Sequence, residues 1–190
     1  EANHAFNYGL GYRSAALRWE IPEAQARTLY DSYHRIYPGV RLMHRWIKDS
    51  LNKTRTVSNL FGFQRQFLDR WDEITKDAYA FPAQSTVAEL INRYGVKYIY
   101  YNHELFPDLI LLNQVHDSVV FEVPLSTGWS QMSRYLFLIK ASLETSLTFR
   151  GRSFTIPADF TLYSQNFAKG TELESLTPEA IEEAYKESVQ

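Results

Sequence analysis

The stretch from Leu111 to Pro124 constrains the fold of this chain most strongly, because two apolar runs rich in β-branched residues flank a short polar interruption. This pattern predicts a β-hairpin with His116, Asp117 and Ser118 at its tip. A hard cation such as Mg²⁺ needs one or two carboxylates in fixed positions and takes its other oxygens from water and phosphate. Asp117 is therefore a candidate metal ligand. The alternative is an ordinary turn, in which Asp117 and Ser118 bond their own backbone.

The chain has 190 residues, 45% of them hydrophobic, which is enough for one core of ordinary size or for two unequal lobes. It has no cysteine, which excludes a disulfide framework and a thiolate metal site. No apolar run approaches the length of a membrane span, and the first residues show no signal pattern. We therefore expect an intracellular protein without a membrane partner.

Charge is distributed unevenly around a net value of −2. From Arg41 to Lys76 there are eight basic residues against four acidic ones, whereas the part after Gly170 has six glutamates and one lysine. The middle of the chain is a candidate phosphate-binding surface, and the acidic end would repel phosphate. A solvated helix face explains the basic run equally well.

Hydrophobic periodicity predicts an α+β fold that is mostly helical. Helices are expected at 1–12, 13–20, 22–36, 40–51, 72–102 and 126–148 and from 177 onward. Besides the central hairpin, a second hairpin is expected at 56–67, and a strand at 153–157 could join the central hairpin as a third member. Pro82 predicts a kink or a boundary within the long helix.

The beginning of the chain has helical composition but no N-cap, which suggests a cut through a longer protein. Tyr8 and Tyr12 are spaced to lie on one helix face. Such a face could stack on nucleotide bases or could simply pack against a core.

Three motifs occur in an order that is far more specific than any one of them. They are His-Ala-Phe-Asn-Tyr-Gly-Leu-Gly-Tyr at 4–12, Pro-Ala-Gln-Ser-Thr-Val-Ala-Glu-Leu at 82–90 and Gln-Val-His-Asp at 114–117. Together they resemble motifs of family A DNA polymerases, the DNA polymerase I family, especially its phage-type members. Tyr-Pro-Gly-Val at 37–40 and Leu-Phe-Gly at 60–62 also fit, so the resemblance covers about residues 1–160.

The resemblance implies the C-terminal, incomplete part of a right-hand polymerase. Residues 1–54 would form fingers helices, and residues 55–160 the C-terminal half of a palm with a small antiparallel sheet and the catalytic hairpin. Residues 161–190 would form an acidic tail with a terminal helix. The implied setting is the cytoplasm of a bacterium or of the bacterial host of a phage.

The implied activity is template-directed addition of deoxynucleotides to a primer 3′-end, with primer-template DNA and dNTPs as partners. Two Mg²⁺ ions, replaceable by Mn²⁺, would take part, with Asp117 as the metal ligand and Asp117 and His116 as the catalytic residues. The implied nucleotide-binding residues are His4, Tyr8 and Tyr12. The implied DNA-binding residues are Arg13, Arg65, Lys76, Gln84 and His116.

One carboxylate cannot hold two cations. The family's other catalytic aspartate belongs to a motif that precedes the fingers helix, and no other Asp-rich stretch of this sequence substitutes for it. We therefore expect an incomplete polymerase that needs an N-terminal fragment, as in a split enzyme.

The sequence departs from the family pattern at several places. His4 stands where the phosphate-binding lysine is expected, and histidine is a weaker ligand for a triphosphate. Arg13 replaces a glycine, Ser118 replaces a frequent glutamate, and Phe63 replaces an arginine that Arg65 could represent.

Two other functions remain open. A single-subunit RNA polymerase often has His-Asp-Ser in its palm motif, as here, although residues 6–9 and the helix containing Gln84 are more similar to those of the DNA enzymes. A non-catalytic DNA-binding subunit of a replication complex could also retain this fold.

Overall fold

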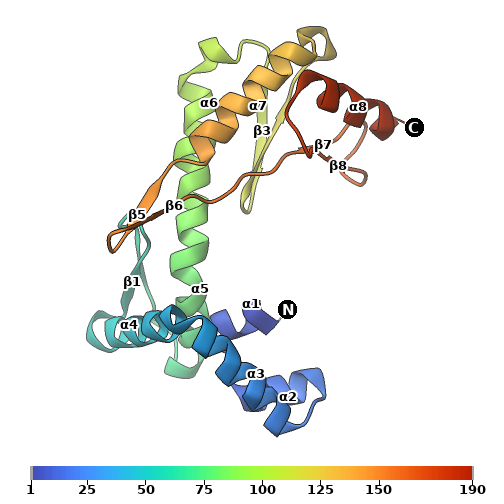
Figure 1. The fold of residues 1–190 in the computed structure, drawn as a ribbon. Coiled ribbons are helices and arrows are strands. Elements are labelled where there is room, and N and C mark those ends of the chain that lie inside the picture. The colour runs from blue at the N-terminus through green and yellow to red at the C-terminus, as the bar shows by residue number, and fades with distance from the viewer. Residues whose placement is uncertain (1, 190) are drawn as a thin grey trace. The chain divides into compact units, whose positions relative to one another are not determined.

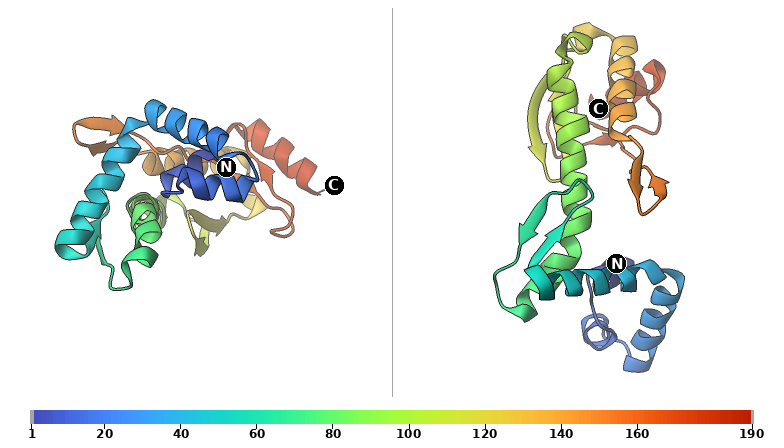
Figure 2. Two further views of the ribbon diagram at one scale, coloured as in Figure 1. Left: turned by 90° about the horizontal axis from the view of Figure 1, so that it is seen from below. Right: turned by 90° about the vertical axis from the view of Figure 1, so that its left-hand side faces the viewer.

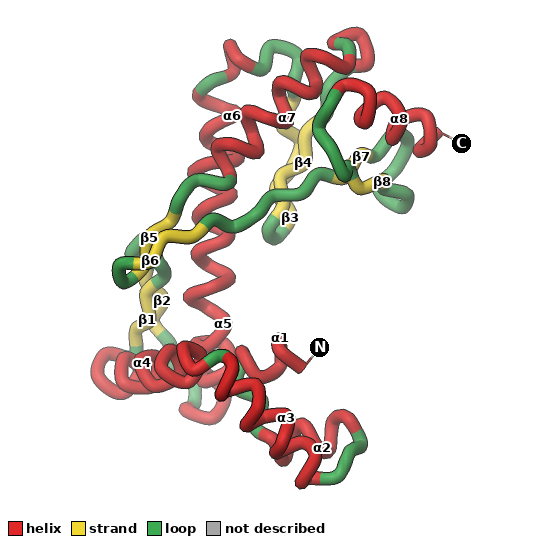
Figure 3. Tube along the Cα trace, in the orientation of Figure 1, coloured by secondary structure: helices red, strands yellow, loops and turns green. Residues whose placement is uncertain are grey.

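The computed structural model describes residues 2–189, and for residues 2 and 71–73 it describes the backbone alone. The chain divides into two compact units, Glu1–Thr86 and Val87–Gln190. Helices dominate both units, and the strands form four separate two-stranded antiparallel sheets (Figure 3). The α+β prediction is therefore confirmed. The predicted division between fingers and palm after residue 54 is a division by function, and it stays a prediction.

The first unit contains four helices before its hairpin (Figure 1). They are α1 (Ala2–Asn7), α2 (Tyr12–Trp19), α3 (Glu23–Ile36) and α4 (Pro38–Thr54). The amphipathic α2 and α3 pack their apolar sides around Phe6 of α1, which is 1% exposed. Thus Phe6 fixes α1 on the other helices.

A second core of the first unit lies between α4, the hairpin of β1 (Thr56–Ser58) and β2 (Gln64–Gln66), and helix α5 (Trp71–Leu90). The buried Asn59 stabilises the hairpin loop, because its Oδ1 accepts hydrogen bonds of 2.9 Å from the amides of Phe61 and Phe63. Its Nδ2 donates to the Ser85 carbonyl at 3.1 Å. Asn59 therefore joins the hairpin to α5.

Helix α5 runs through Pro82 without an end. The departure from α-helical geometry comes later, in the π-helical segment η1 (Ile91–Val96), after which α6 (Lys97–Tyr101) completes the predicted long helix. The division between the two units falls after Thr86. The hydroxyl of Thr86 donates to the Pro82 carbonyl at 2.6 Å, within the same helical turn.

The second unit is built around the hairpin of β3 (Ile110–Val115) and β4 (Ser118–Glu122), with α7 (Trp129–Leu143) against it. Helix α8 (Pro178–Val189) packs on α7, and Figure 1 shows the two side by side. Two single-turn helices, η2 (His103–Leu105) and η3 (Leu125–Thr127), also belong to this unit. So does the short strand pair of β7 (Thr161–Leu162) and β8 (Thr171–Glu172). Tyr135, fully buried on α7, lies at the centre of the main core.

The strand predicted at 153–157 does not join the central hairpin. Instead β5 (Leu147–Phe149) pairs with β6 (Arg152–Phe154) as a separate two-stranded sheet. The reason is local, because Arg150 and Gly151 both have positive φ, 50° and 76°, which is the geometry of a tight two-residue hairpin turn. The prediction of a three-stranded sheet was therefore wrong. Among the described residues, no helix is long and apolar enough to cross a membrane.

Candidate functional site

The central hairpin has the predicted tip. Val115 pairs with Ser118, so His116 and Asp117 form a two-residue turn, in which His116 has φ 51°. The Ser118 hydroxyl donates to the Val115 carbonyl at 2.8 Å and closes the turn. His116 and Asp117 are exposed, and among the described residues the Asp117 carboxylate has no hydrogen bond or ion pair. The strand pair therefore presents the Asp117 carboxylate to solvent.

Asp117 suits one ligand position of a hard cation, because its carboxylate is exposed and its backbone is fixed. A complete site needs more donors. Within the part of the chain that the structure describes, no three His, Cys, Asp or Glu side chains come together to hold a metal ion. The residues present can therefore supply one carboxylate but not the whole donor set.

The predicted continuous helix over residues 1–12 is interrupted. Helix α1 ends at Asn7, and α2 begins at Tyr12. Gly9, between them, has φ +83°. Tyr8 and Tyr12 thus do not share one helix face, and that expectation was wrong. The rings of His4 and Tyr8 remain in edge-to-face contact, with centroids 4.4 Å apart.

Three side chains, which we call the Asn7 clamp, hold the end of α1: Tyr33, His44 and Tyr79. The Tyr33 hydroxyl donates to Asn7 Oδ1 at 2.6 Å, and His44 Nε2 donates to the Asn7 backbone carbonyl at 2.7 Å. The His44 ring stacks on the Tyr79 ring, with centroids 3.9 Å apart and planes 14° apart. Asn7 is therefore fixed through its side chain and its backbone.

The Tyr79 ring also lies against Gly9. A Cβ at this glycine would come within 2.6 Å of two Tyr79 ring atoms. Tyr8 thus lies between Asn7, which the clamp holds, and Gly9, where there is no room for a side chain. The clamp was not predicted from the sequence. The one available signal was Gly9, because a glycine directly after Asn7 and Tyr8 can indicate a close contact with the backbone.

Burial shifts the pKa values of two clamp residues. It raises the pKa of Tyr33, and it lowers the pKa of His44, to which the charge of Lys48 also contributes. The hydrogen bond from His44 to Asn7 opposes the lowering. Both shifts favour the neutral side chain.

The predicted DNA-contacting side chains of the first unit all reach solvent. Arg13 lies 3.5 Å from Glu23 and over the ring of Tyr12, and the nearby Tyr12 and Glu23 raise its pKa. Arg65 lies over the Phe67 ring, with 4.7 Å from its guanidinium carbon to the centroid. The remaining two, Lys76 and Gln84, are exposed on α5.

The basic run gives α4 a positively charged outer surface. Its exposed members on this helix are Arg41, Arg45, Lys48 and Lys53. Arg41 is 3.5 Å from Asp31 of α3. An exposed ion pair of this kind adds little stability, so the surface keeps most of its capacity to attract phosphate.

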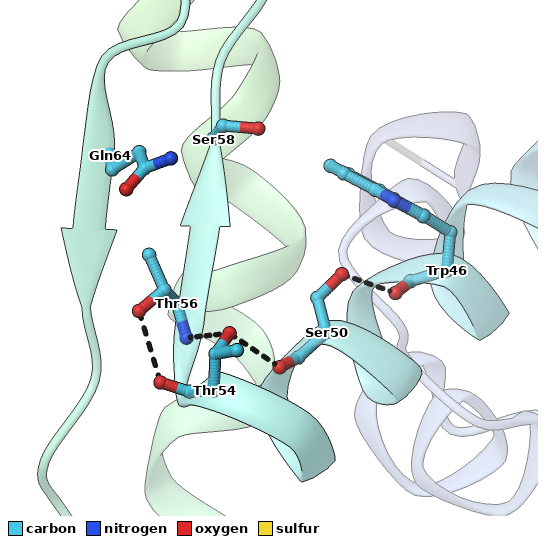
Figure 4. A pocket seen from close by; sticks show the side chains of 6 residues that line it. All are labelled: Trp46, Ser50, Thr54, Thr56, Ser58 and Gln64. Atoms are coloured by element: carbon cyan, nitrogen blue, oxygen red, sulfur yellow. Dashed lines mark hydrogen bonds between the residues drawn. The ribbon is translucent and has the colours of Figure 1, made fainter.

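A polar hollow of about 210 Å³ lies between α4 and the first hairpin (Figure 4). Its lining residues are Trp46, Ser50, Thr54, Thr56, Ser58 and Gln64. The hydroxyls of Ser50, Thr54 and Thr56 donate to nearby backbone carbonyls, as the dashed lines in Figure 4 show. None of the predicted site residues lines this hollow.

Comparison with known proteins points to one family. The model of the family described as DNA polymerase family A matches residues 1–155. The thermostable DNA polymerase I of Thermus filiformis is 31% identical over 137 residues, which are 64% of this chain and 15% of that protein. DNA polymerase I of Deinococcus radiodurans is 31% identical over 138 residues, 63% of this chain and 13% of that protein.

A solved structure has the same fold. It is the POL domain of Pol1 from M. smegmatis in complex with DNA primer-template and dNTP. The likeness covers 74% of this chain and 25% of that one, at 20% sequence identity and a TM-score of 0.64.

Proposed function

This chain belongs to DNA polymerase family A, and we propose that it supplies the C-terminal fingers and palm of a DNA-directed DNA polymerase. The chain spans 15% and 13% of the lengths of the two DNA polymerase I relatives. The observation that carries the proposal is the exposed carboxylate of Asp117 on a two-residue hairpin tip, within the region that matches the family.

In the proposed reaction, the 3′-oxygen of a primer attacks the α-phosphorus of a dNTP, and pyrophosphate leaves. Asp117 would hold Mg²⁺, or Mn²⁺ in its place. Two such ions stabilise the attacking and the leaving oxygens of an in-line displacement. The family's other catalytic aspartate belongs to a motif that this sequence does not contain, and we therefore propose that an N-terminal fragment of the polymerase supplies the second carboxylate.

The first unit would bind the nucleotide and the DNA. Tyr8, positioned by the Asn7 clamp, would pack against the incoming sugar, and the exposed His4 would contact the triphosphate. Tyr12 would share its space with the templating base. Since the cationic side chains of Arg13, Arg65 and Lys76 reach solvent, they would contact DNA phosphates.

The amide of Gln84 and the imidazole of His116 would test the geometry of the new base pair. Gln84 and His116 would donate to purine N3 and pyrimidine O2 in the minor groove of the primer end. These acceptors are common to every correct pair, so contacts to them carry no sequence information. We place the reaction in the cytoplasm of a bacterium or of a phage-infected bacterium.

Primer extension tests the proposal. The chain is assayed with Mg²⁺, dNTPs and a labelled primer-template, alone and mixed with the N-terminal polymerase fragment. We expect synthesis only in the mixture and a loss of about a thousandfold or more for Asp117→Asn, since one metal ligand is removed. Asp159→Asn, which makes the same chemical change at an exposed position of the same unit, is the matched control.

Three results would contradict the proposal. Synthesis by Asp117→Asn at the control rate would show that this carboxylate holds no metal. Synthesis by this chain alone would remove the need for a second fragment. A preference for ribonucleotides over deoxynucleotides would identify an RNA polymerase instead.

A further inference from the structure

The hairpin of β5 and β6 carries exposed aromatic and basic side chains that the proposed reaction does not use. Phe149 is 50% exposed, Phe154 is 44% exposed, and Arg150 and Arg152 are exposed at or beside the turn. Figure 2, in its right-hand view, shows the hairpin projecting from the end of α7. Exposed phenylalanines on a projecting element indicate a contact surface.

The strand register places the aromatic side chains on one face. Phe149 pairs with Arg152, and Leu147 pairs with Phe154. Because directly paired residues share a face and side chains alternate along a strand, these four residues lie on the same side of the hairpin. We call Phe149, Arg152 and Phe154 the aromatic face. The guanidinium of Arg150 lies over the Phe149 ring, 5.3 Å from its centroid.

The opposite side of the hairpin is polar. Thr148 pairs with Ser153, and their hydroxyl oxygens are 3.1 Å apart. One side of this small sheet is therefore aromatic and basic, and the other carries only hydroxyl groups.

The base of the hairpin is held firmly to α7. Glu144 Oε1 accepts a hydrogen bond from the Ala158 amide at 3.0 Å and pairs with Lys140 Nζ at 2.7 Å. Lys140 also donates to the Ala158 carbonyl. Leu147, 5% exposed, anchors the first strand. These contacts attach the base of the hairpin to α7, while Phe149 and Phe154 remain about half exposed.

The charge of the hairpin favours an anionic ligand. From residue 145 to residue 158 the sequence has two arginines and no aspartate or glutamate. The carboxylate of the preceding Glu144 is paired with Lys140, and hydrogen bonds from Lys140 and Ala158 lower its pKa. The positive charge at the turn is thus not neutralised from within the segment.

We propose that the β5–β6 hairpin binds single-stranded nucleic acid, with bases stacked on Phe149 and Phe154 and phosphates contacted by Arg150 and Arg152. Aromatic platforms beside cationic side chains are the combination that binds single strands independently of sequence. Arginine also matches phosphate geometry with two parallel donors. An apolar protein partner would leave both arginines without an anion.

The inference rests on the proposed function in one respect, namely that DNA is the substrate of this chain. It is independent of the roles proposed for Asp117 and Tyr8. The ligand would be an unpaired segment of template, because bases stack on side chains only where they are not already stacked in a duplex.

Fluorescence anisotropy with a labelled oligo-dT strand tests the inference on the full chain. The variants are Phe149→Ala/Phe154→Ala and Arg150→Ala/Arg152→Ala. The matched control is Arg134→Ala/Phe137→Ala, which removes an exposed arginine and a 52% exposed phenylalanine from α7. Circular dichroism melting checks that each variant is folded.

We expect each hairpin variant to bind oligo-dT at least about fivefold more weakly than the control. The arginine variant should also lower the slope of log K against log salt by about 1.4, since each lost phosphate contact on a single strand contributes about 0.7.

Two outcomes overturn the inference. If both hairpin variants bind like the control while the unmodified chain binds DNA, the hairpin is not a nucleic-acid surface, and the proposed function stands. If Phe149→Ala/Phe154→Ala abolishes self-association in sedimentation without weakening oligo-dT binding, the aromatic face binds a second copy instead. Failure of the proposed function would be seen separately, as synthesis by Asp117→Asn in primer extension.

Discussion

His44 Nε2 lies 2.7 Å from the backbone carbonyl oxygen of Asn7, the last residue of α1. A carbonyl can only accept, so the ring must carry its proton on Nε2. The same ring stacks on Tyr79, which in turn leaves no room for a side chain at Gly9. Two residues distant in sequence thus define the backbone on both sides of Tyr8, the residue proposed to meet the incoming sugar.

His44→Phe should lower the free energy of unfolding by about 1 kcal/mol. The substitution keeps an aromatic ring that can stack on Tyr79, and it removes the hydrogen bond to Asn7. Urea unfolding at pH 8 measures the change. Lys48→Met, one turn later on α4 at an exposed position, is the control and should have little effect. Equal stabilities of the two variants would contradict a stabilising role for the bond.

Stability should fall in mild acid because of two histidines of the first unit, the buried His34 and the partly buried His44. Burial lowers the pKa of both His34 and His44 from the ordinary value of 6.5, and for His34 the charge of Arg41 adds to the effect. The unfolded chain therefore takes up protons first. The two neutral histidines therefore contribute fully to the free energy of unfolding above about pH 6.5. This contribution is lost as the pH falls below that value and passes through the lowered pKa values of the folded protein.

Unfolding free energies between pH 8 and pH 5 measure this dependence. His34 is 3% exposed, and neither ring nitrogen has a hydrogen-bond partner among the described residues. His34→Leu removes one of the two histidines whose pKa is lowered, so it should make the dependence shallower. A flat profile for the unmodified chain would exclude protonation of these histidines as a cause of unfolding.

Tyr8→Phe should strengthen discrimination against dideoxynucleotides in the assembled polymerase. In the proposed arrangement Tyr8 packs against the incoming sugar, so its hydroxyl can supply a polar contact that a dideoxynucleotide, which lacks the 3′-hydroxyl, has lost. The ratio of kcat/KM for a dNTP to that for its dideoxy analogue measures the effect. Tyr37→Phe, at an exposed position after α3, is the control. An unchanged ratio for Tyr8→Phe would show that Tyr8 does not pack against the incoming sugar.

Local patterns predicted local structure well. The hairpin around His116 and Asp117 was predictable, because apolar alternation and a polar tip are both properties of neighbouring residues. The pairing of β5 with β6 was missed although its cause is also local, since the Arg150–Gly151 turn directs residues 147–149 onto 152–154. The strand composition alone does not reveal which partner a strand will choose.

The Asn7 clamp could not be predicted, because its three side chains come from separate helices. His44 lies among basic residues of α4, and Tyr79 lies within a run of apolar residues of α5. Nothing in the sequence shows that His44 bonds Asn7 or that Tyr79 lies against Gly9. The interruption of the helix after Asn7 has the same origin, since the contact of Gly9 with Tyr79 is a tertiary one. The assignment of Asp117 as a metal ligand remains a prediction from family resemblance and exposure.

Gly9→Ala should destabilise the first unit by at least about 1 kcal/mol, since Gly9 has φ +83° and an added Cβ would meet the Tyr79 ring at 2.6 Å. Gly11→Ala is the matched control. Its backbone is extended, with φ −75°, and a Cβ there would meet nothing within 4 Å. It should therefore be neutral or stabilising by a few tenths of a kcal/mol.

A double-mutant cycle separates the two causes of the effect at Gly9. In a Tyr79→Ala background the ring is absent, so Gly9→Ala should be less costly than in the unmodified chain, and the remaining cost should reflect the positive φ alone. Urea unfolding of the four proteins measures the coupling. If the cost is the same in both backgrounds, Tyr79 does not confine the backbone beside Tyr8. The clamp would then act only through the hydrogen bonds that Tyr33 and His44 make to Asn7.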